Sequence, residues 1–201
     1  SGIGLETAVE LARRGWSVAA TMRNLDKRGA LEQAAARAGA TERLTIERLD
    51  VTDAPAMRAY ATALLARTGG RLDAVVHNAG VAVGAAFEDL PEAQLRLVLE
   101  LTRLLLPAFR AQRRGRIAVV SSNSAYAGEP ANSIYCASKW AVEGWAESIA
   151  YELEPFGIDV LLIEPGPYRT EIWSRSPRIR PPGTASGPML DVLAKAVDAP
   201  V

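Results

Sequence analysis

The sequence predicts an α/β protein with a doubly wound parallel sheet and helices on both faces, in three αβα layers. Short apolar segments of strand length alternate with amphipathic segments of helical length, which is the pattern of βαβ crossovers. Several of the short segments are uninterrupted apolar runs, which suit strands buried on both faces. Right-handed crossovers then wind such strands into one sheet, whose ligands bind beyond the carboxyl ends of the strands.

Amphipathic segments with recognisable ends predict the helices. Gly15 ends the first, and Asn24 and Asp53 can each cap the start of a helix through a side-chain oxygen. Pro107 lies inside the fourth segment, where a helix can break. We expect helices at residues 4–14, 24–38, 54–67, 91–114 and 134–154.

Apolar or alternating segments between these helices predict the strands, at residues 17–22, 43–49, 72–77, 116–122 and 158–165. The tail changes character, because residues 171–201 are rich in proline and contain one short helical pattern at 189–197. We interpret residues 167–201 as a loop-rich flap and the whole of 1–201 as a single domain.

Composition excludes several classes of function. Basic and acidic residues number 23 each, so nothing suggests a nucleic-acid partner or a membrane surface. No apolar run approaches the roughly 18–20 residues that span a bilayer. The single cysteine, Cys136, allows no intramolecular disulfide and fits a reducing compartment, so a cytoplasmic location is expected. The single histidine, His77, excludes a multi-histidine zinc site; we predict no metal and interpret His77 as structural.

The segment SGIG, residues 1–4, directly precedes the first helix. Gly2 and Gly4 would let the backbone, with that of Ser1 and Ile3, approach a pyrophosphate at the helix N-terminus, where free N–H groups and the helix dipole favour anions. Glycines also occur in ordinary turns, so this motif alone is weak.

A dinucleotide fold needs a second strand that ends about 20 residues after the glycines, where a side chain reads the adenosine ribose. The residue at that point is Arg23, and neither Thr21 nor Met22 is a carboxylate. A guanidinium pairs with a 2′-phosphate, whereas a carboxylate accepts from the free 2′-hydroxyl of NAD. The sequence therefore favours NADP(H). Asp26 is close enough to keep NAD open, and a solvated arginine is the other alternative.

Two further strand ends carry candidate cofactor contacts. Asp50 can accept from the adenine amino group with Val51 against the ring, although LDVTD (49–53) also reads as a plain capping turn. After the next strand, Asn78 can hold neighbouring backbone, and Gly80 can pass close to a ligand, with Ala79 between them.

The segment SIYCASKWAVEG, residues 133–144, places Lys139 four residues after Tyr135, on the same face of a helix. A free phenol titrates near pH 10, and acid–base work near neutrality needs a pKa two to three units lower, roughly 3–4 kcal/mol. An ammonium about 4 Å away supplies roughly 4 kcal/mol at an effective dielectric of 20. We therefore expect Lys139 to lower the pKa of Tyr135. A surface Tyr–Lys pair is the alternative.

Ser122 closes a strand thirteen residues before Tyr135, on the same rim of a parallel sheet. Its hydroxyl can donate to a carbonyl oxygen or accept from an alcohol. Ser121 and Ser124 compete for this role.

Together, in order and spacing, these motifs resemble the short-chain dehydrogenase/reductase family in its single-domain, Rossmann-like form. SGIG resembles the end of its TGxxxGxG loop, HNAG (77–80) its NNAG motif, and Ser122, Tyr135 and Lys139 its serine and YxxxK pair. EPGPYRT (164–170) resembles its PG…T segment.

The resemblance implies hydride transfer between NADP(H) and a carbinol or ketone carbon, with Tyr135 as the general acid or base. It implies that Lys139 also binds the nicotinamide ribose and that Ser122 orients the substrate oxygen. It further implies that Pro165 and Gly166 line the nicotinamide and that Thr170 contacts its carboxamide. A homodimer or homotetramer, paired through the helices at 91–114 and 134–154, is implied by resemblance only.

Three departures from the family pattern matter. The family's opening strand and first loop glycine have no counterpart before Ser1, so we expect further residues upstream in the native chain. No asparagine occurs between Ala79 and Ser122, where the family places one that holds a water in the proton relay, and the helix there is about two turns short around 98–101. We favour missing residues over an altered relay. The usual final strand and helix have no counterpart before Val201.

The substrate is a small carbonyl or alcohol compound whose identity the sequence does not give. Tyr168, Ile172, Trp173 and the prolines of the flap suggest a fairly apolar lid, although packing explains them equally well. Trp140 and Trp145 are expected in the core or an interface. Two alternatives remain open: an NAD-dependent enzyme of the same fold, and a non-catalytic dinucleotide-binding sensor.

Overall fold

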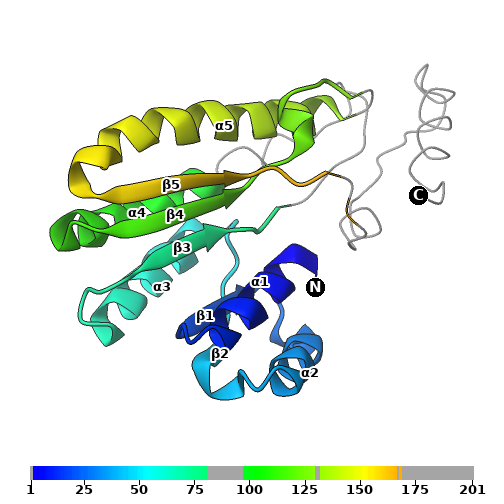
Figure 1. Cartoon of the computed structure of the whole chain (residues 1–201), viewed down its shortest axis with the longest axis vertical. Coiled ribbons are helices and arrows are strands. Elements are labelled where there is room, and N and C mark those ends of the chain that lie inside the picture. Colours follow the sequence, from blue (N-terminus) through cyan, green and yellow to red (C-terminus); the bar gives the residue numbers. More distant parts are fainter. Residues whose placement is uncertain (1, 81–96, 130–131, 167, 169–201) are drawn as a thin grey trace, which may run out of the picture. The chain divides into compact units, whose positions relative to one another are not determined.

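A computed structural model describes residues 2–80, 97–129, 132–166 and 168 (Figure 1). The chain divides into two compact units: Ser1–Leu72 with Leu97–Gln112, and Asp73–Arg96 with Arg113–Val201. Each unit contains its own parallel sheet with helices packed on it, as the alternation of apolar and amphipathic segments predicts. Among the described helices, none is both long enough and apolar enough to cross a membrane.

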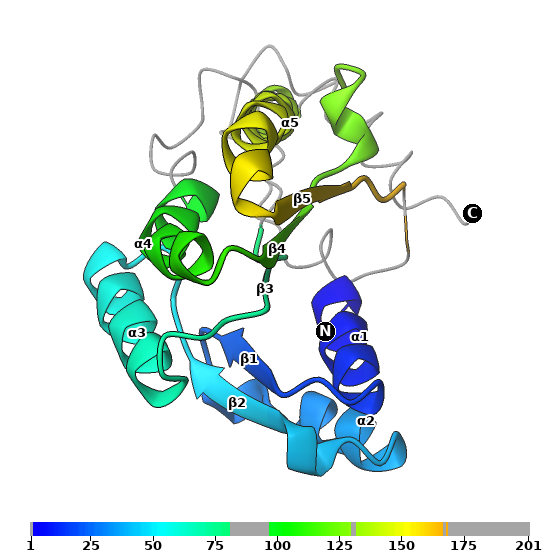
Figure 2. The ribbon, with the colours of Figure 1, turned by 60° about the vertical axis from the view of Figure 1, so that its left-hand side comes forward.

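The first unit is built on a two-stranded parallel sheet. Its elements are α1 (Gly2–Arg13), β1 (Val18–Met22), α2 (Gly29–Arg37), β2 (Leu44–Arg48), α3 (Ala54–Arg67) and α4 (Leu97–Gln112). Strand β1 pairs with β2 in a register that runs from Val18 opposite Leu44 to Met22 opposite Arg48. Helices α1 and α2 bury Val9 and Leu31 against this sheet (Figure 2), so apolar burial holds them together.

The ends of these helices follow the expected capping signals, with one difference. Asp53 accepts from the Ala56 N–H at 2.9 Å and caps α3, and Gly15, at φ +96°, follows the end of α1. Asn24 caps a short 3₁₀-helix, Leu25–Lys27, by accepting from the Asp26 N–H at 2.9 Å. The predicted helix 24–38 is therefore a 3₁₀ turn followed by α2.

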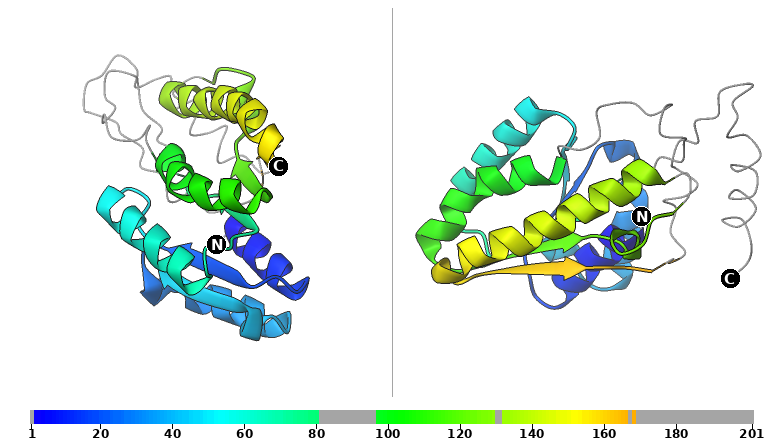
Figure 3. Two further views of the ribbon diagram at one scale, coloured as in Figure 1. Left: turned by 90° about the vertical axis from the view of Figure 1, so that its left-hand side faces the viewer. Right: turned by 90° about the horizontal axis from the view of Figure 1, so that it is seen from above.

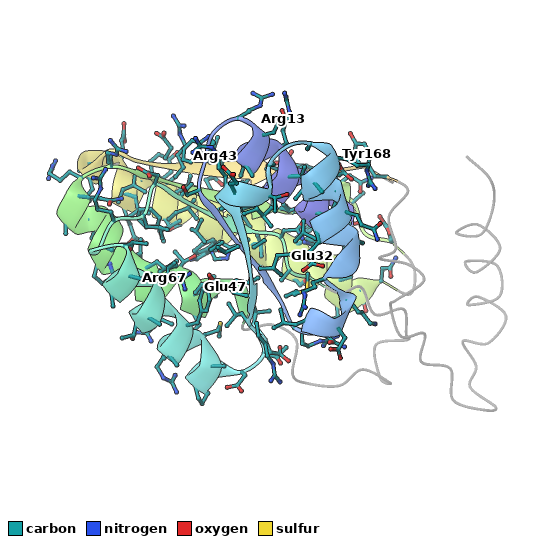
Figure 4. The ribbon with its side chains drawn as sticks, turned by 90° about the horizontal axis from the view of Figure 1, so that it is seen from below. Arg13, Glu32, Arg43, Glu47, Arg67 and Tyr168 are labelled. Carbon is teal, nitrogen blue, oxygen red and sulfur yellow. The ribbon has the colours of Figure 1, made fainter. Side chains whose placement is uncertain are left out.

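Helices α3 and α4 lie side by side in the first unit (Figure 3). The α4 helix continues through Pro107 without ending there, so the break considered at this proline does not occur; residues 91–96 of the predicted helix lie outside the described part. At the end of α3, the Arg67 guanidinium contacts the Glu47 carboxylate of β2 at 2.7 Å (Figure 4). Arg67 also lies 5.9 Å from the centre of the Tyr60 ring on the same helix, so it is the ion pair with Glu47 that ties α3 to the sheet.

The second unit is built on a three-stranded parallel sheet in the order β3–β4–β5. Its elements are β3 (Ala74–His77), β4 (Gly115–Val120), α5 (Ser133–Leu153) and β5 (Ile158–Ile163). Helix α5 runs along β5 (Figure 1) and buries Leu153, while β4 buries Ile117 and Val119. Because the three strands are parallel, their carboxyl ends meet at one edge of this sheet.

A left-handed turn starts β5. The 3₁₀-helix Glu154–Phe156 ends at Gly157, which has φ +66°. A Cβ at Gly157 would lie 2.9 Å from the carbonyl oxygen of Arg113, itself at φ +52°. Only glycine fits this turn without strain, since both the backbone conformation and the close approach oppose a side chain.

We therefore expect Gly157→Ala to lower the free energy of unfolding by about 1 kcal/mol or more, measured by urea denaturation. Gly144→Ala, inside α5 with nothing within 4 Å of its Cβ, is the matched control. That substitution should stabilise the protein by about 0.5–1 kcal/mol. Equal effects of the two substitutions would contradict the strained turn.

Candidate active site

The first two turns of α5 carry Tyr135 and Lys139 on one face, as the four-residue spacing predicts. The Lys139 Nζ lies 5.6 Å from the centre of the Tyr135 ring. It also donates a hydrogen bond to the carbonyl oxygen of Val120, the last residue of β4, at 2.9 Å. The ammonium is thus fixed between the phenol ring and the end of a strand.

Ser122 follows β4 and is buried. The β4–β5 pairing continues beyond both strands, because the Ser121 N–H donates to Ile163 O at 2.7 Å and the Asn123 N–H donates to Pro165 O at 3.2 Å. With its backbone held in this way, the Ser122 hydroxyl forms a hydrogen bond with the phenol of Tyr135. The structure therefore brings Ser122, Tyr135 and Lys139 together at the carboxyl edge of the sheet.

The two competing serines have different surroundings. The Ser121 Oγ is buried without a hydrogen-bond partner among the described residues. The Ser124 Oγ donates to the Glu129 carboxylate at 2.7 Å. Of the three serines, Ser122 forms the hydrogen bond with the phenol.

The pKa of Tyr135 is raised, so the predicted lowering by Lys139 is wrong for this geometry. Burial of the phenol is the largest cause; the hydrogen bond from Ser122 opposes it, and the negative charge of Glu129 adds to it. Burial also lowers the pKa of Lys139, against the attraction of Glu143. The ammonium lies over the ring and on a backbone carbonyl, so its charge does not offset the burial of the phenol.

The other predicted residues of the second unit lie at the same edge of the sheet. Asn78, Ala79 and Gly80 directly follow β3 and are exposed. Gly166 follows β5 by three residues, is exposed, and has open space where a Cβ would lie. Pro165 is held through its carbonyl oxygen by the Asn123 N–H. These backbone segments offer polar groups and room beside the Ser122–Tyr135 pair.

His77 ends β3 and is buried. Burial lowers its pKa to about 4, so the imidazole is neutral near pH 7. A buried, neutral side chain at a strand end supports the structural interpretation of this histidine.

In the first unit, the predicted cofactor residues lie at the starts and ends of elements. Gly2 has φ +62° and, with Ile3 and Gly4, forms the first turn of α1, which contains no acidic residue. A helix N-terminus of this kind fits an anionic group such as a pyrophosphate.

Arg23 and Asp50 follow the carboxyl ends of β1 and β2. Asp50 accepts from the Thr52 N–H at 2.9 Å and from the Thr52 hydroxyl at 2.7 Å. These two bonds, with the positive charge of Arg23, lower the pKa of Asp50. The structure thus places the exposed Arg23 near Asp50. Val51, the residue after Asp50, is half-buried.

The remaining predictions meet the structure in part. Ser1, Thr170, Ile172 and Trp173 lie outside the described residues, as does most of the predicted flap. Tyr168 is exposed (Figure 4). Trp145 is half-buried, whereas Trp140 is 54% exposed and donates its indole N–H to Ser124 O at 3.0 Å, so Trp140 is not a core residue.

Sequence reasoning missed Glu129, although it lies beside the site. Its carboxylate accepts from Ser124 and, at 3.0 Å, from the Asn132 side-chain amide. The signal was an acidic residue in the loop between Ser122 and Tyr135. Glu143 was also missed: one of its carboxylate oxygens is buried without a hydrogen-bond partner in the described part of the chain.

A family model described as short chain dehydrogenase matches residues 1–179 of the 201. The chain belongs to the short-chain dehydrogenase family. This confirms the resemblance inferred from the glycine, serine and tyrosine–lysine motifs, and it makes the protein a member of an oxidoreductase family.

Two relatives in this family are similar over most of the chain. Retinol dehydrogenase 8 of Bos taurus is 42% identical over 183 residues, which cover 85% of this chain and 57% of the bovine protein. The 17-beta-hydroxysteroid dehydrogenase type 1 of Homo sapiens is 40% identical over 183 residues, covering 85% of this chain and 55% of the human protein. The chain therefore spans little more than half the length of these two relatives.

A solved structure of the same family supports the fold. The crystal structure of a metagenomic short-chain oxidoreductase in complex with NADP aligns with a TM-score of 0.75 and 28% identity. The alignment covers 100% of this chain and 88% of that one. The predicted fold class, a Rossmann-like α/β fold with helices on both faces of parallel strands, is thereby confirmed.

The buried His77 predicts a pH dependence of stability. The unfolded chain binds a proton near pH 6.5, whereas the folded chain does so only near pH 4, so the folded state loses stability as the pH falls between these values. The loss due to His77 should reach about 2 kcal/mol at pH 5. Urea denaturation of the wild type and of His77→Gln between pH 7 and pH 5 measures it. An unchanged pH slope in the variant would contradict this effect.

Proposed function

We propose that the protein interconverts a secondary alcohol and a ketone or aldehyde with NADP(H), using Tyr135 as the general acid or base. The observation that carries this proposal is the contact of Ser122, Tyr135 and Lys139 at the carboxyl edge of β4. Bound NADP(H) would supply or accept the hydride, and the side chains of this cluster would manage the proton.

The raised pKa of Tyr135 keeps the phenol protonated near pH 7. A protonated phenol is the form that donates to a developing alkoxide, so the resting site is prepared for carbonyl reduction. Ser122 orients the substrate oxygen toward the phenol of Tyr135. Lys139 packs against the phenol ring and binds the cofactor ribose.

Support for NADP(H) comes from Arg23, an exposed guanidinium directly after β1 with no carboxylate at the two preceding positions. Arg23 is suited to pair with a 2′-phosphate. The family structure solved with NADP agrees with this preference. NAD is the alternative cofactor, because Asp26 follows Arg23 by three residues and could accept from a free 2′-hydroxyl.

We propose an apolar substrate of retinoid or steroid size. The two similar relatives are named for retinol and for hydroxysteroids. In this chain Tyr168, which follows Gly166 closely, is an exposed aromatic residue at the edge that carries the catalytic cluster. We further propose a cytoplasmic homo-oligomer paired through α4 and α5; on α5, Trp140 and Tyr151 are large exposed apolar side chains.

Tyr135→Phe should lower kcat for ketone reduction at least about 1,000-fold, because a phenyl ring has no proton to donate. Tyr151→Phe is the matched control: it lies on the same helix, is 72% exposed, and should keep wild-type activity. The measurement is NADPH consumption with a panel of retinoid, steroid and fatty ketones. NADPH binding with no turnover on any substrate would favour a cofactor sensor instead.

Arg23→Ala should weaken NADPH binding about 10- to 100-fold, the range of a charge-assisted hydrogen bond worth roughly 1.5–3 kcal/mol. NADH binding should change less than about threefold, because NADH has no 2′-phosphate for Arg23 to contact. Arg37→Ala, an exposed arginine at the end of α2, serves as the control for net charge. Fluorescence titration with both cofactors measures the two affinities, and an equal loss for NADPH and NADH would remove the case for phosphate recognition.

A further inference from the structure

A half-buried carboxylate lies beside the catalytic cluster of the second unit. Glu129 belongs to the loop between Ser122 and Tyr135, and its Oε1 accepts from the Ser124 hydroxyl at 2.7 Å. The Ser124 Oγ in turn lies 3.2 Å from the Ser122 Oγ. One hydroxyl oxygen therefore separates the carboxylate from the serine that the proposed reaction places against the substrate oxygen.

The loop holds both oxygens of this carboxylate. Asn132 donates its side-chain amide to the Glu129 Oε2 at 3.0 Å, and the Asn132 N–H donates to the Glu129 carbonyl oxygen at 3.1 Å. Ser124 donates to the other carboxylate oxygen, so each of the two oxygens has its own donor. These bonds fix the side chain in place beside Ser122.

The charge of Glu129 has no cationic partner in the described part of the chain. Its two side-chain hydrogen bonds come from neutral groups, and no arginine, lysine or histidine of residues 2–80, 97–129, 132–166 and 168 forms an ion pair with it. A carboxylate that is partly removed from water and held by neutral donors is a group that a cation stabilises. It also has room for another donor, because a carboxylate offers about four acceptor sites.

Lys139 does not supply this cation. Its ammonium is held by the Val120 carbonyl oxygen at 2.9 Å and lies 5.6 Å from the centre of the Tyr135 ring. Burial lowers the pKa of Lys139, and the charge of Glu143 opposes that effect. The pKa of Tyr135 is raised by burial and further by the charge of Glu129. The two carboxylates therefore act on different members of the catalytic cluster, and the charge of Glu129 acts where the substrate reacts.

We propose that Glu129 binds an ammonium group on the substrate carbon next to the carbinol or carbonyl carbon, and so selects amino alcohols and amino ketones over their uncharged analogues. This inference rests on the proposed alcohol–ketone activity and deepens it, because it adds one charged group to an otherwise apolar substrate. The ammonium takes no part in the hydride or proton transfer. It positions the reacting carbon by fixing the neighbouring carbon.

The dimensions of such a substrate fit the loop. In a vicinal amino alcohol the nitrogen lies about 3 Å from the reacting oxygen, by standard bond lengths. With that oxygen at Ser122, the nitrogen can reach the Glu129 carboxylate, because only the Ser124 hydroxyl separates the two residues. A hydrogen bond between two charged groups is roughly twice as strong as one between neutral groups, so an ammonium is preferred to a hydroxyl at this position.

Oxidation of three matched alcohols with NADP⁺ tests the proposal. They are long-chain secondary alcohols that carry an ammonium, a hydroxyl or a methyl group on the carbon next to the carbinol. At pH 7 the wild type should oxidise the ammonium compound with a kcat/KM at least about tenfold above that of the methyl compound, the range of one charge-assisted hydrogen bond. Glu129→Gln should reduce this preference to less than about threefold, because glutamine keeps hydrogen-bonding groups for the loop but carries no charge.

The ratio of the two kcat/KM values separates recognition from a structural role. If Glu129 only held the loop, Glu129→Gln would change the rates of all three alcohols alike and leave the ratio unchanged, and that result would overturn the proposal. A wild-type ratio near one would also overturn it. Glu147→Gln, which removes an exposed carboxylate of α5, is the matched control and should keep the wild-type ratio.

Calorimetric binding to Tyr135→Phe gives a second readout that needs no turnover. In the presence of NADP⁺ this variant should bind the ammonium compound at least about tenfold more tightly than the methyl compound, and adding Glu129→Gln should remove the difference. Equal affinities in Tyr135→Phe would overturn the proposal. Absence of turnover of all three alcohols by the wild type would instead count against the proposed function, and the binding ratio would still test recognition by Glu129.

Discussion

The site depends on one hydrogen bond, between the hydroxyl of Ser122 and the phenol of Tyr135. Neither residue is placed by its own side chain. Ser122 is held because the backbone of β4 continues to pair with the segment after β5, through the Ser121 and Asn123 N–H groups. Tyr135 is held by the first turn of α5, where the Cys136 N–H donates to Asn132 O at 2.8 Å. The pairing of β4 with the segment after β5 therefore sets the position of Ser122, and the first turn of α5 sets the position of Tyr135.

Burial is the second constraint, and it outweighs the charge of Lys139. A phenol removed from water resists ionisation, and the carboxylate of Glu129 adds to that resistance. These surroundings therefore favour the protonated phenol near pH 7. A protonated phenol is the form that can donate to a developing alkoxide, and the hydrogen bond from Ser122 partly opposes the effect of burial.

Most of the fold could be predicted from the sequence, because apolar periodicity and capping residues are local signals. The predicted helix 54–67 coincides with α3, capped by Asp53 as expected, and each of the five strands lies within its predicted range or begins one residue before it. The contact of Ser122, Tyr135 and Lys139 was also predictable, since a strand end and a helix face fix their positions. The α2 segment differed because Asn24 closes a tight 3₁₀ turn before the helix can begin.

The electrostatics of the site could not be predicted in the same way. The spacing of Tyr135 and Lys139 gives a shared face but neither the burial of the phenol nor the position of the ammonium over the ring. The place of Glu129 depends on a non-helical loop, in which side chains of Ser124 and Asn132 fold the chain onto the carboxylate. Such side-chain contacts follow from the three-dimensional loop and have no periodic signal in the sequence.

The most direct test of this account is the ionisation of Tyr135 in the wild-type protein, followed by NMR of tyrosine labelled with ¹³C at Cζ and assigned with Tyr135→Phe. The account predicts that the Tyr135 signal keeps its neutral position up to at least pH 9, because burial and Glu129 hold its pKa above the ordinary value of 10.0. A phenolate signal from Tyr135 at or below pH 8 would contradict it and return the mechanism to a tyrosine made acidic by Lys139.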